Sequence, residues 1–160
     1  MDPDEILNFW FPNTMYQKWW FIGSQQLDQE ITDKYYGQIQ SLFSNFHIDE
    51  YKTVPINKII SDIILLDQFS RNISRVIKDI DVNAYTEKAE LLSNIWIERQ
   101  YYLTEPIAHT VFAFLPIRHS KNKIKIRKLL PVLDEIKNFN NNESNPIYNK
   151  FYTHTLKAIQ

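Results

Sequence analysis

The stretch that decides the fold is residues 55–69, PINKIISDIILLDQF. Proline is favoured at the start of a helix, and the isoleucines and leucines that follow recur at helical spacing around most of the circumference. A helix that is apolar on nearly all sides has no face to present to water, so it is expected at the centre of a bundle. The middle of the core is predicted to consist of Ile60, Ile63, Ile64 and Leu66.

Helical stripes also recur on both sides of this segment. Asp2, Ser24 and Asp81 stand where an N-cap is expected, directly before apolar residues at helical spacing. The chain has only two glycines, too few for the hairpin turns of a typical sheet protein. We therefore predict a single all-α domain spanning residues 1–160, built from antiparallel helix pairs. The expected helices cover about 3–11, 24–46, 55–69, 81–96, 104–115, 120–137 and 146–159, with a polar linker at 138–145.

Composition excludes several classes of protein. The chain has no cysteine, which rules out disulfides, thiolate chemistry and cysteine-ligated metal. Its formal net charge of −1 provides no field that would attract nucleic acid. The N-terminus is acidic where a signal peptide needs positive charge, and the longest apolar run, residues 63–66, is far too short to cross a bilayer. We expect a soluble cytoplasmic protein with no nucleic-acid or membrane partner; its oligomeric state stays open.

A first polar cluster follows the apolar helix directly. It contains Asp67, Gln68, Arg71, Asn72 and Arg75. In one interpretation the helix ends here, an ion pair joins Asp67 to Arg71 four residues on, and Asn72 forms the cap. In the other, the cluster is the floor of a pocket in which Arg71 or Arg75 holds an anionic group through its guanidinium fork.

A second polar cluster, Arg118, His119 and Ser120, follows an aromatic helix that is expected to end at Pro116. Histidine is the usual proton carrier near neutral pH, which makes His119 a candidate general base. Alternatively, Ser120 is only the N-cap of the next helix and His119 is a loop residue. A kink, or a later helix start, is expected at Pro131, because proline lacks the N–H group that a helix interior needs.

Other candidate sites are weaker. His47, His109 and His154 show no spacing with carboxylates that is typical of a metal site, so no metal is expected. The pair Trp19–Trp20 is interpreted as core. No phosphate loop, dinucleotide fingerprint or nucleophile elbow is present, so no cofactor is expected either.

The two polar clusters lie in longer strings that resemble a known family. Residues 65–73, LLDQFSRNI, and 112–120, FAFLPIRHS, are similar to the paired signature LLDQFPRNI and FxYLPxxHSE of domain-of-unknown-function family 924 (DUF924). Residues 6–11, ILNFWF, and Trp20-Phe21 with Asp28 resemble its opening blocks. The resemblance implies a tetratricopeptide-like bundle of about seven helices and no established activity. Its recurrent polar positions match Asp67, Gln68, Arg71, Asn72, His119 and Ser120.

The chain also departs from this pattern. Ser70 stands where the pattern has proline, and Lys121 stands where it has glutamate, so a carboxylate that would have joined His119 is missing. Many relatives continue past the position of Gln160 with an FGRFPHRN-like segment, so a site that needs this segment is not expected within residues 1–160.

Three hypotheses for function follow. The first is a module that binds a peptide or a small anionic ligand at the two clusters. The second is a small-molecule hydrolase with His119 as general base, Asp67 orienting it and Arg71 stabilising negative charge. In the third, the polar residues are purely structural. Because buried polar groups need partners, we predict that Asp67 or Arg71 lies within one side-chain length, or one bridging water, of His119 or its backbone. The binding and hydrolase hypotheses both depend on this convergence.

Overall fold

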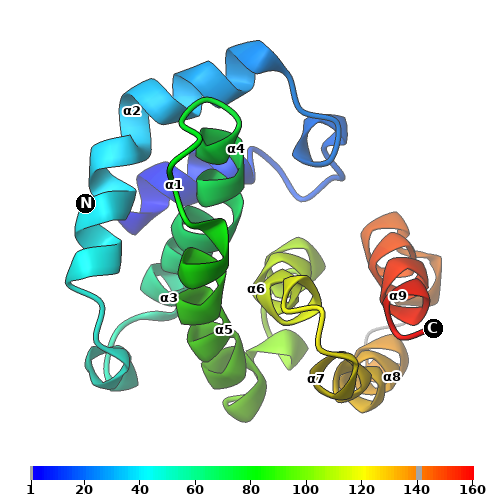
Figure 1. Cartoon of the computed structure of the whole chain (residues 1–160). Coiled ribbons are helices and arrows are strands. Elements are labelled where there is room, and N and C mark those ends of the chain that lie inside the picture. The colour runs from blue at the N-terminus through cyan, green and yellow to red at the C-terminus, as the bar shows by residue number, and fades with distance from the viewer. Residues whose placement is uncertain (1, 140–141) are drawn as a thin grey trace.

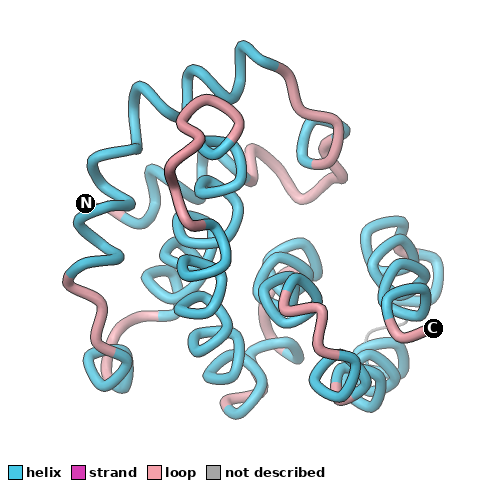
Figure 2. The backbone as a smooth tube through the Cα atoms, viewed as in Figure 1, coloured by secondary structure: helices cyan, strands magenta, loops and turns pink. Residues whose placement is uncertain are grey.

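The computed structural model describes residues 2–139 and 142–160, and every regular element in this part of the chain is helical (Figures 1 and 2). The predicted all-α fold is therefore confirmed. Four short 3-10 turns, at 18–20, 48–52, 101–103 and 142–144, join the longer helices. The longer helices are α1 (Pro3–Trp10), α2 (Gln25–Ser44), α3 (Ile56–Ile63), α4 (Ser70–Ser74), α5 (Val82–Glu98), α6 (Ile107–His119), α7 (Lys123–Arg127), α8 (Leu129–Phe139) and α9 (Pro146–Ala158).

The apolar segment is the central helix, as predicted. The four residues expected at its centre, Ile60, Ile63, Ile64 and Leu66, are each fully buried. The helix does not end near Phe69, however. It continues through a π-helical stretch, residues 64–69, into α4, so residues 56–74 form one unbroken helix. Asn72 lies inside α4 and is not a cap, which corrects the predicted boundary.

Helices α1, α2, α5 and α6 pack around this central one (Figure 1). The first two helices pack along it, α1 against α3 and α2 against α4, while α5 lies beside it and packs on α6. The last helix, α9, covers the far side of α6. The predicted caps are confirmed, since the side chains of Asp2, Ser24 and Asp81 each accept a hydrogen bond from a backbone N–H in the first helical turn.

The boundary around the second cluster differs from the prediction. Helix α6 runs through Pro116 and ends at His119, and Ser120 is its C-cap. A proline inside a helix costs roughly 3 kcal/mol, but residues 110–117 are all buried, and packing of this kind outweighs a local preference. The chain then restarts at Asn122, whose side chain caps α7.

The helix predicted over residues 120–137 is in fact two helices, as the kink or later start expected at Pro131 indicated. α7 and α8 are separate helices that meet at Lys128, so Pro131 lies in the first turn of α8, where its missing N–H costs little. In the predicted linker, residues 140 and 141 lie outside the described residues. No helix in the described part of the chain is long and apolar enough to cross a membrane.

Candidate functional site

The site begins at the π-helical stretch of the central helix. Its six residues are all buried, including Asp67 and Gln68. π-Helical turns are rare inside α-helices and are frequently found at functional sites, because the wider turn redirects side chains and backbone groups. Here the wide turn carries the two polar residues that end the apolar run.

Asp67 is the centre of a buried hydrogen-bond network. Its carboxylate lies 2.9 Å from Nδ1 of His119 and accepts a hydrogen bond of 2.9 Å from Oγ1 of Thr86. The Gln68 amide also donates to it at 3.2 Å, and Nη2 of Arg71 is 3.4 Å away. The predicted convergence of the two clusters is therefore confirmed, and so is the Asp67–Arg71 pair. Thr86, on α5, was not predicted.

The charge of Asp67 follows from these contacts. Burial alone would raise its pKa, but the charge and hydrogen bond of His119, the nearby Arg71 and the Thr86 hydroxyl more than offset burial, so the pKa is lowered. An ionised carboxylate only accepts hydrogen bonds, so Nδ1 of His119 carries a proton. The other ring nitrogen, Nε2, forms no hydrogen bond with any described residue, and the His119 side chain lines a pocket.

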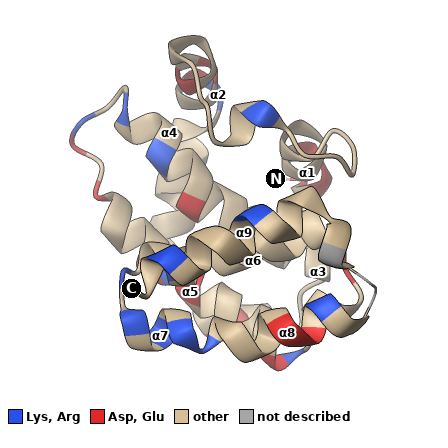
Figure 3. Cartoon of the chain, turned by 90° about the vertical axis from the view of Figure 1, so that its right-hand side faces the viewer, with Lys and Arg blue, Asp and Glu red and all other residues tan. Residues whose placement is uncertain are grey.

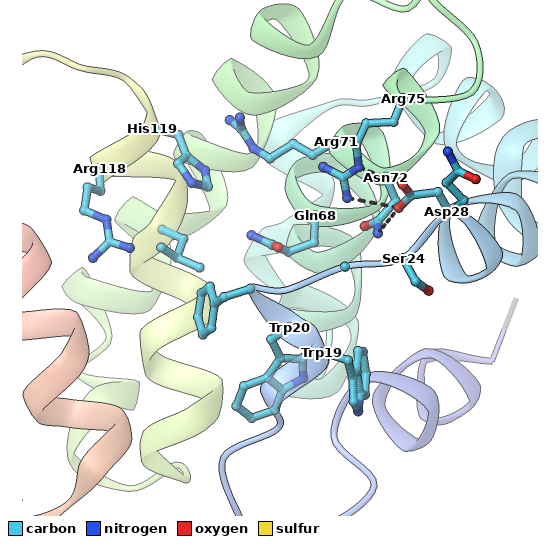
Figure 4. Close-up of a pocket in the computed structure, with 14 residues that line it drawn as sticks. Trp19, Trp20, Ser24, Asp28, Gln68, Arg71, Asn72, Arg75, Arg118 and His119 are labelled. Carbon is cyan, nitrogen blue, oxygen red and sulfur yellow. Dashed lines mark hydrogen bonds and ion pairs between the residues drawn. The ribbon is translucent and has the colours of Figure 1, made fainter.

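A second network joins α2 to the end of the central helix. Arg75 donates two hydrogen bonds to Asp28, from Nε at 2.8 Å and from Nη2 at 3.0 Å, and Asn72 donates a third at 2.9 Å (Figure 4). Burial would raise the pKa of Asp28, but the bonds from Arg75 and Asn72 lower it. The fork of Arg75 is thus already filled by a carboxylate of the chain itself.

A pocket of about 520 Å³ opens between these two networks (Figure 4). One wall is aromatic and comes from residues 19–21, and the opposite wall is polar and comes from the central helix and the end of α6. Six of the eight predicted binding residues line it, whereas Asp67 and Ser120 do not; the Ser120 hydroxyl donates to the carbonyl of Ile117. The lining residues are Trp19, Trp20, Phe21, Gly23, Ser24, Gln25, Asp28, Gln68, Arg71, Asn72, Arg75, Leu115, Arg118 and His119.

Arg118 has no acidic partner within the described part of the chain. Its Nη1 donates to the carbonyl of Phe151 at 3.3 Å, and its guanidinium lies 4.6 Å from the centre of the Phe151 ring. Burial lowers the pKa of Arg118 to about 10, opposed by the charge of Asp67. Even so, Arg118 stays charged at neutral pH.

Arg71 also retains donor capacity. Its Nη2 is shared between Asp67 and Thr86, but its Nε is buried without a hydrogen-bond partner. A buried donor that lacks a partner costs about 1–3 kcal/mol. Since Asp28 is matched by Arg75 and Asp67 by Arg71, the positive charge of Arg118 is the one left over among these groups.

Comparison with known proteins agrees with the sequence pattern. The model of the family described as "Bacterial protein of unknown function (DUF924)" matches residues 6–160. The chain belongs to this family. No curated protein and no solved structure matches it, so the tetratricopeptide-like arrangement stays a prediction.

Two residues that depart from the DUF924 pattern, Ser70 and Lys121, are not among the residues that line the pocket. Ser70 is buried beneath it, and its hydroxyl donates to the backbone carbonyl of Asp67 at 3.0 Å. Lys121 lies beyond the end of α6 in a left-handed conformation, with φ of 59°. The carboxylate partner that His119 was expected to lack is supplied by Asp67 instead. The described residues contain no group of three His, Asp or Glu side chains that could hold a metal ion.

Proposed function

We propose that the pocket binds a small molecule through an anionic group held by Arg118 and Arg71. The observation that carries this proposal is the Arg118 guanidinium, which lines the pocket and has no ion-pair partner among the described residues. Guanidinium groups recognise carboxylates and phosphates through paired N–H donors.

The size and lining of the pocket support the same proposal. Ligand pockets typically measure about 300–1,000 Å³ and combine an apolar wall with a few placed polar groups, and this pocket of about 520 Å³ lies within that range. Its aromatic wall, residues 19–21, faces the polar one. The positive charge of Arg118, which no acidic partner among the described residues offsets, favours an anionic ligand.

Thermal unfolding with a panel of anions tests this function. The panel is propionate, benzoate, octanoate and inorganic phosphate at constant ionic strength, with the wild type, Arg118→Met and Arg127→Met. Arg127 is an exposed arginine on α7 outside the pocket, so it is the matched control. At a hundred times Kd a ligand stabilises the folded state by about 2.7 kcal/mol, which raises Tm by several degrees. We expect this rise in the wild type and in Arg127→Met and its loss in Arg118→Met. The proposal is wrong if no anion raises Tm, or if the Arg118 variant responds like the wild type.

A second candidate function rests on the Asp67–His119 pair. When the His119 ring is neutral, the buried carboxylate holds its one proton on Nδ1, and Nε2 is then the nitrogen that can accept a second proton. In ester hydrolysis Nε2 would take a proton from water while the water oxygen bonds to the acyl carbon. The leaving alkoxide would then depart with the proton from the imidazolium. Ser24, the one serine lining the pocket, already caps α2, so water is the nucleophile in this scheme.

Hydrolysis of p-nitrophenyl acetate separates this function from binding alone. Positioned general bases contribute about 10²–10⁴-fold to rate. His119→Gln should therefore lower kcat/KM at least a hundredfold. His47→Gln, at an exposed histidine outside both the first pocket and the pocket beside α9, should leave it unchanged. No turnover by the wild type, or equal turnover by His119→Gln, would remove the hydrolase hypothesis without affecting the binding one.

A further inference from the structure

A second pocket of about 270 Å³ adjoins the first. It lies between α6, α9 and the segment of residues 16–22. Two side chains, Phe21 and Arg118, line both pockets, and Arg118 extends from α6 toward α9 (Figure 4). The two pockets therefore meet at a guanidinium group. The second pocket is lined by Tyr16, Phe21, Ile22, Val111, Arg118, Ile147, Lys150, Phe151 and His154.

The linings of the two pockets differ in chemistry. Most residues of the first are polar, whereas six of the nine in the second are aliphatic or aromatic. The other three, Arg118, Lys150 and His154, are basic. The sequence of α9 contains lysines but no acidic residue (Figure 3). An apolar cavity with basic residues and no acid complements an apolar body that is attached to an anion.

Phe21 and Lys150 form the boundary of this second pocket. The Phe21 ring stacks on Phe112 and is 41% exposed, so it divides the pockets without sealing them from each other. Lys150 donates to the hydroxyl of Tyr16 at 2.7 Å and lies 4.9 Å from the Phe21 ring centre. The Lys150 charge is thus held against aromatic rings and not against a carboxylate.

We propose that the ligand is an amphiphilic monocarboxylic acid whose carboxylate lies between Arg118 and Arg71 and whose apolar chain fills the second pocket. This inference rests on the proposed anion-binding function and adds the chemical class of the ligand. The carboxylate matches the Arg118 guanidinium, which has no acidic partner among the described residues, and the chain matches the apolar lining. A polar acid without such a chain leaves the second pocket unused and binds more weakly.

Titration calorimetry with propionate and octanoate tests the inference. Each buried methylene tightens binding by about fourfold, so we expect octanoate to bind the wild type at least tenfold more tightly than propionate. The discriminating variant is Ile22→Asp, which places a negative charge in the second pocket at a side chain that is 65% exposed. Ile124→Asp is the matched control, because Ile124 is 68% exposed and lies on α7, outside both pockets.

The expected pattern is specific. Ile22→Asp should weaken octanoate at least tenfold and propionate less than threefold, and Ile124→Asp should change neither. Equal affinity of the wild type for the two acids overturns the inference while leaving anion binding in place. So does an equal loss of octanoate affinity in the two aspartate variants. If neither acid binds and the wider anion panel fails as well, it is the proposed function that has failed.

Discussion

Replacing Asp67 by asparagine should be among the most destabilising single changes at the site. The side chain is 0% exposed, and its carboxylate accepts from His119, Thr86 and Gln68 at 2.9–3.2 Å. Asparagine keeps one oxygen but turns an amide N–H₂ toward these donors. Hydrogen bonds to charged groups contribute about 1.5–3 kcal/mol each, and breaking a buried charge pair costs about 3–5 kcal/mol. We expect Asp67→Asn to lower the free energy of unfolding by an amount on the order of 3–5 kcal/mol.

Arg71→Met should destabilise the protein much less than Asp67→Asn does. The Arg71 side chain is 30% exposed, and its contact with Asp67 is long, at 3.4 Å. When Arg71 is removed, Asp67 keeps its other donors and is not left unpaired. The loss of stability should therefore be about 1 kcal/mol, in the range of weakly bonded, partly exposed pairs.

Urea unfolding followed by tryptophan fluorescence measures both variants, because four tryptophans report on the core. The midpoint should fall much further for Asp67→Asn than for Arg71→Met at an unchanged m-value. The pH dependence supplies a second check. The pKa of Asp67 is lowered in the folded state, so its contribution is complete above the unfolded value of about 3.9 and is lost as pH falls through the lower folded value. The gap between wild type and Asp67→Asn should thus narrow below about pH 4. Equal losses in the two variants, or a gap that widens in acid, would refute this account of the network.

Two further outcomes concern the core. Ile63→Ala should cost on the order of 2–5 kcal/mol in the same urea assay, since Ile63 is fully buried at the centre of the bundle; a loss below about 1 kcal/mol would contradict its central position. Burial lowers the pKa of His109 to about 4. The unfolded histidine titrates near 6.5, so as pH falls from about 6.5 toward 4 the unfolded state binds a proton that the folded state does not. The free energy of unfolding is therefore unaffected by His109 above that range and decreases within it. Wild type should lose roughly 2 kcal/mol between pH 7 and pH 4 that His109→Phe does not lose, and parallel pH profiles for the two proteins would argue against a neutral buried histidine.

The sequence predicted the parts of the fold that depend on local pattern. The apolar repeat of residues 55–69 placed Ile63 and Ile64 in the core, and capping residues located the starts of several helices. Boundaries were wrong where packing outweighed local signals. Asn72 and Pro116 both resemble helix ends, yet the first is bonded to Asp28 of α2 and the second lies in a wholly buried turn. Neither the Asn72–Asp28 hydrogen bond nor the burial around Pro116 can be predicted from the pattern of a single helix.

The candidate site was predictable to a similar extent. Three polar residues interrupt apolar helices: Asp67, Arg71 and His119. Buried polar groups need hydrogen-bond partners, so we predicted that these residues contact one another. Thr86, the partner of Asp67 and Arg71, and Asp28, the partner of Asn72 and Arg75, stand in amphipathic helices where threonine and aspartate ordinarily face water. Helical periodicity alone therefore did not predict their contacts. The role of Arg75 was likewise misjudged from its type alone, because only the folded chain shows that its guanidinium is filled by Asp28.

The polar residues of the site differ in whether the folded chain itself supplies their hydrogen-bond and ion-pair partners, and this difference distinguishes a structural from a functional role. Arg75 and Asp28 satisfy each other, and Asp67 is satisfied by three donors besides Arg71, so these groups hold α2, α5 and α6 to the central helix whether or not a ligand is present. Arg118 and Nε of Arg71 are different, because among the described residues folding has given Arg118 no acidic partner and Nε no hydrogen-bond partner at all. Burying such groups costs free energy that packing must offset. A purely structural role accounts for the first set and leaves the unpaired charge of Arg118 unexplained, whereas an anion bound to its guanidinium in the pocket would supply the missing partner.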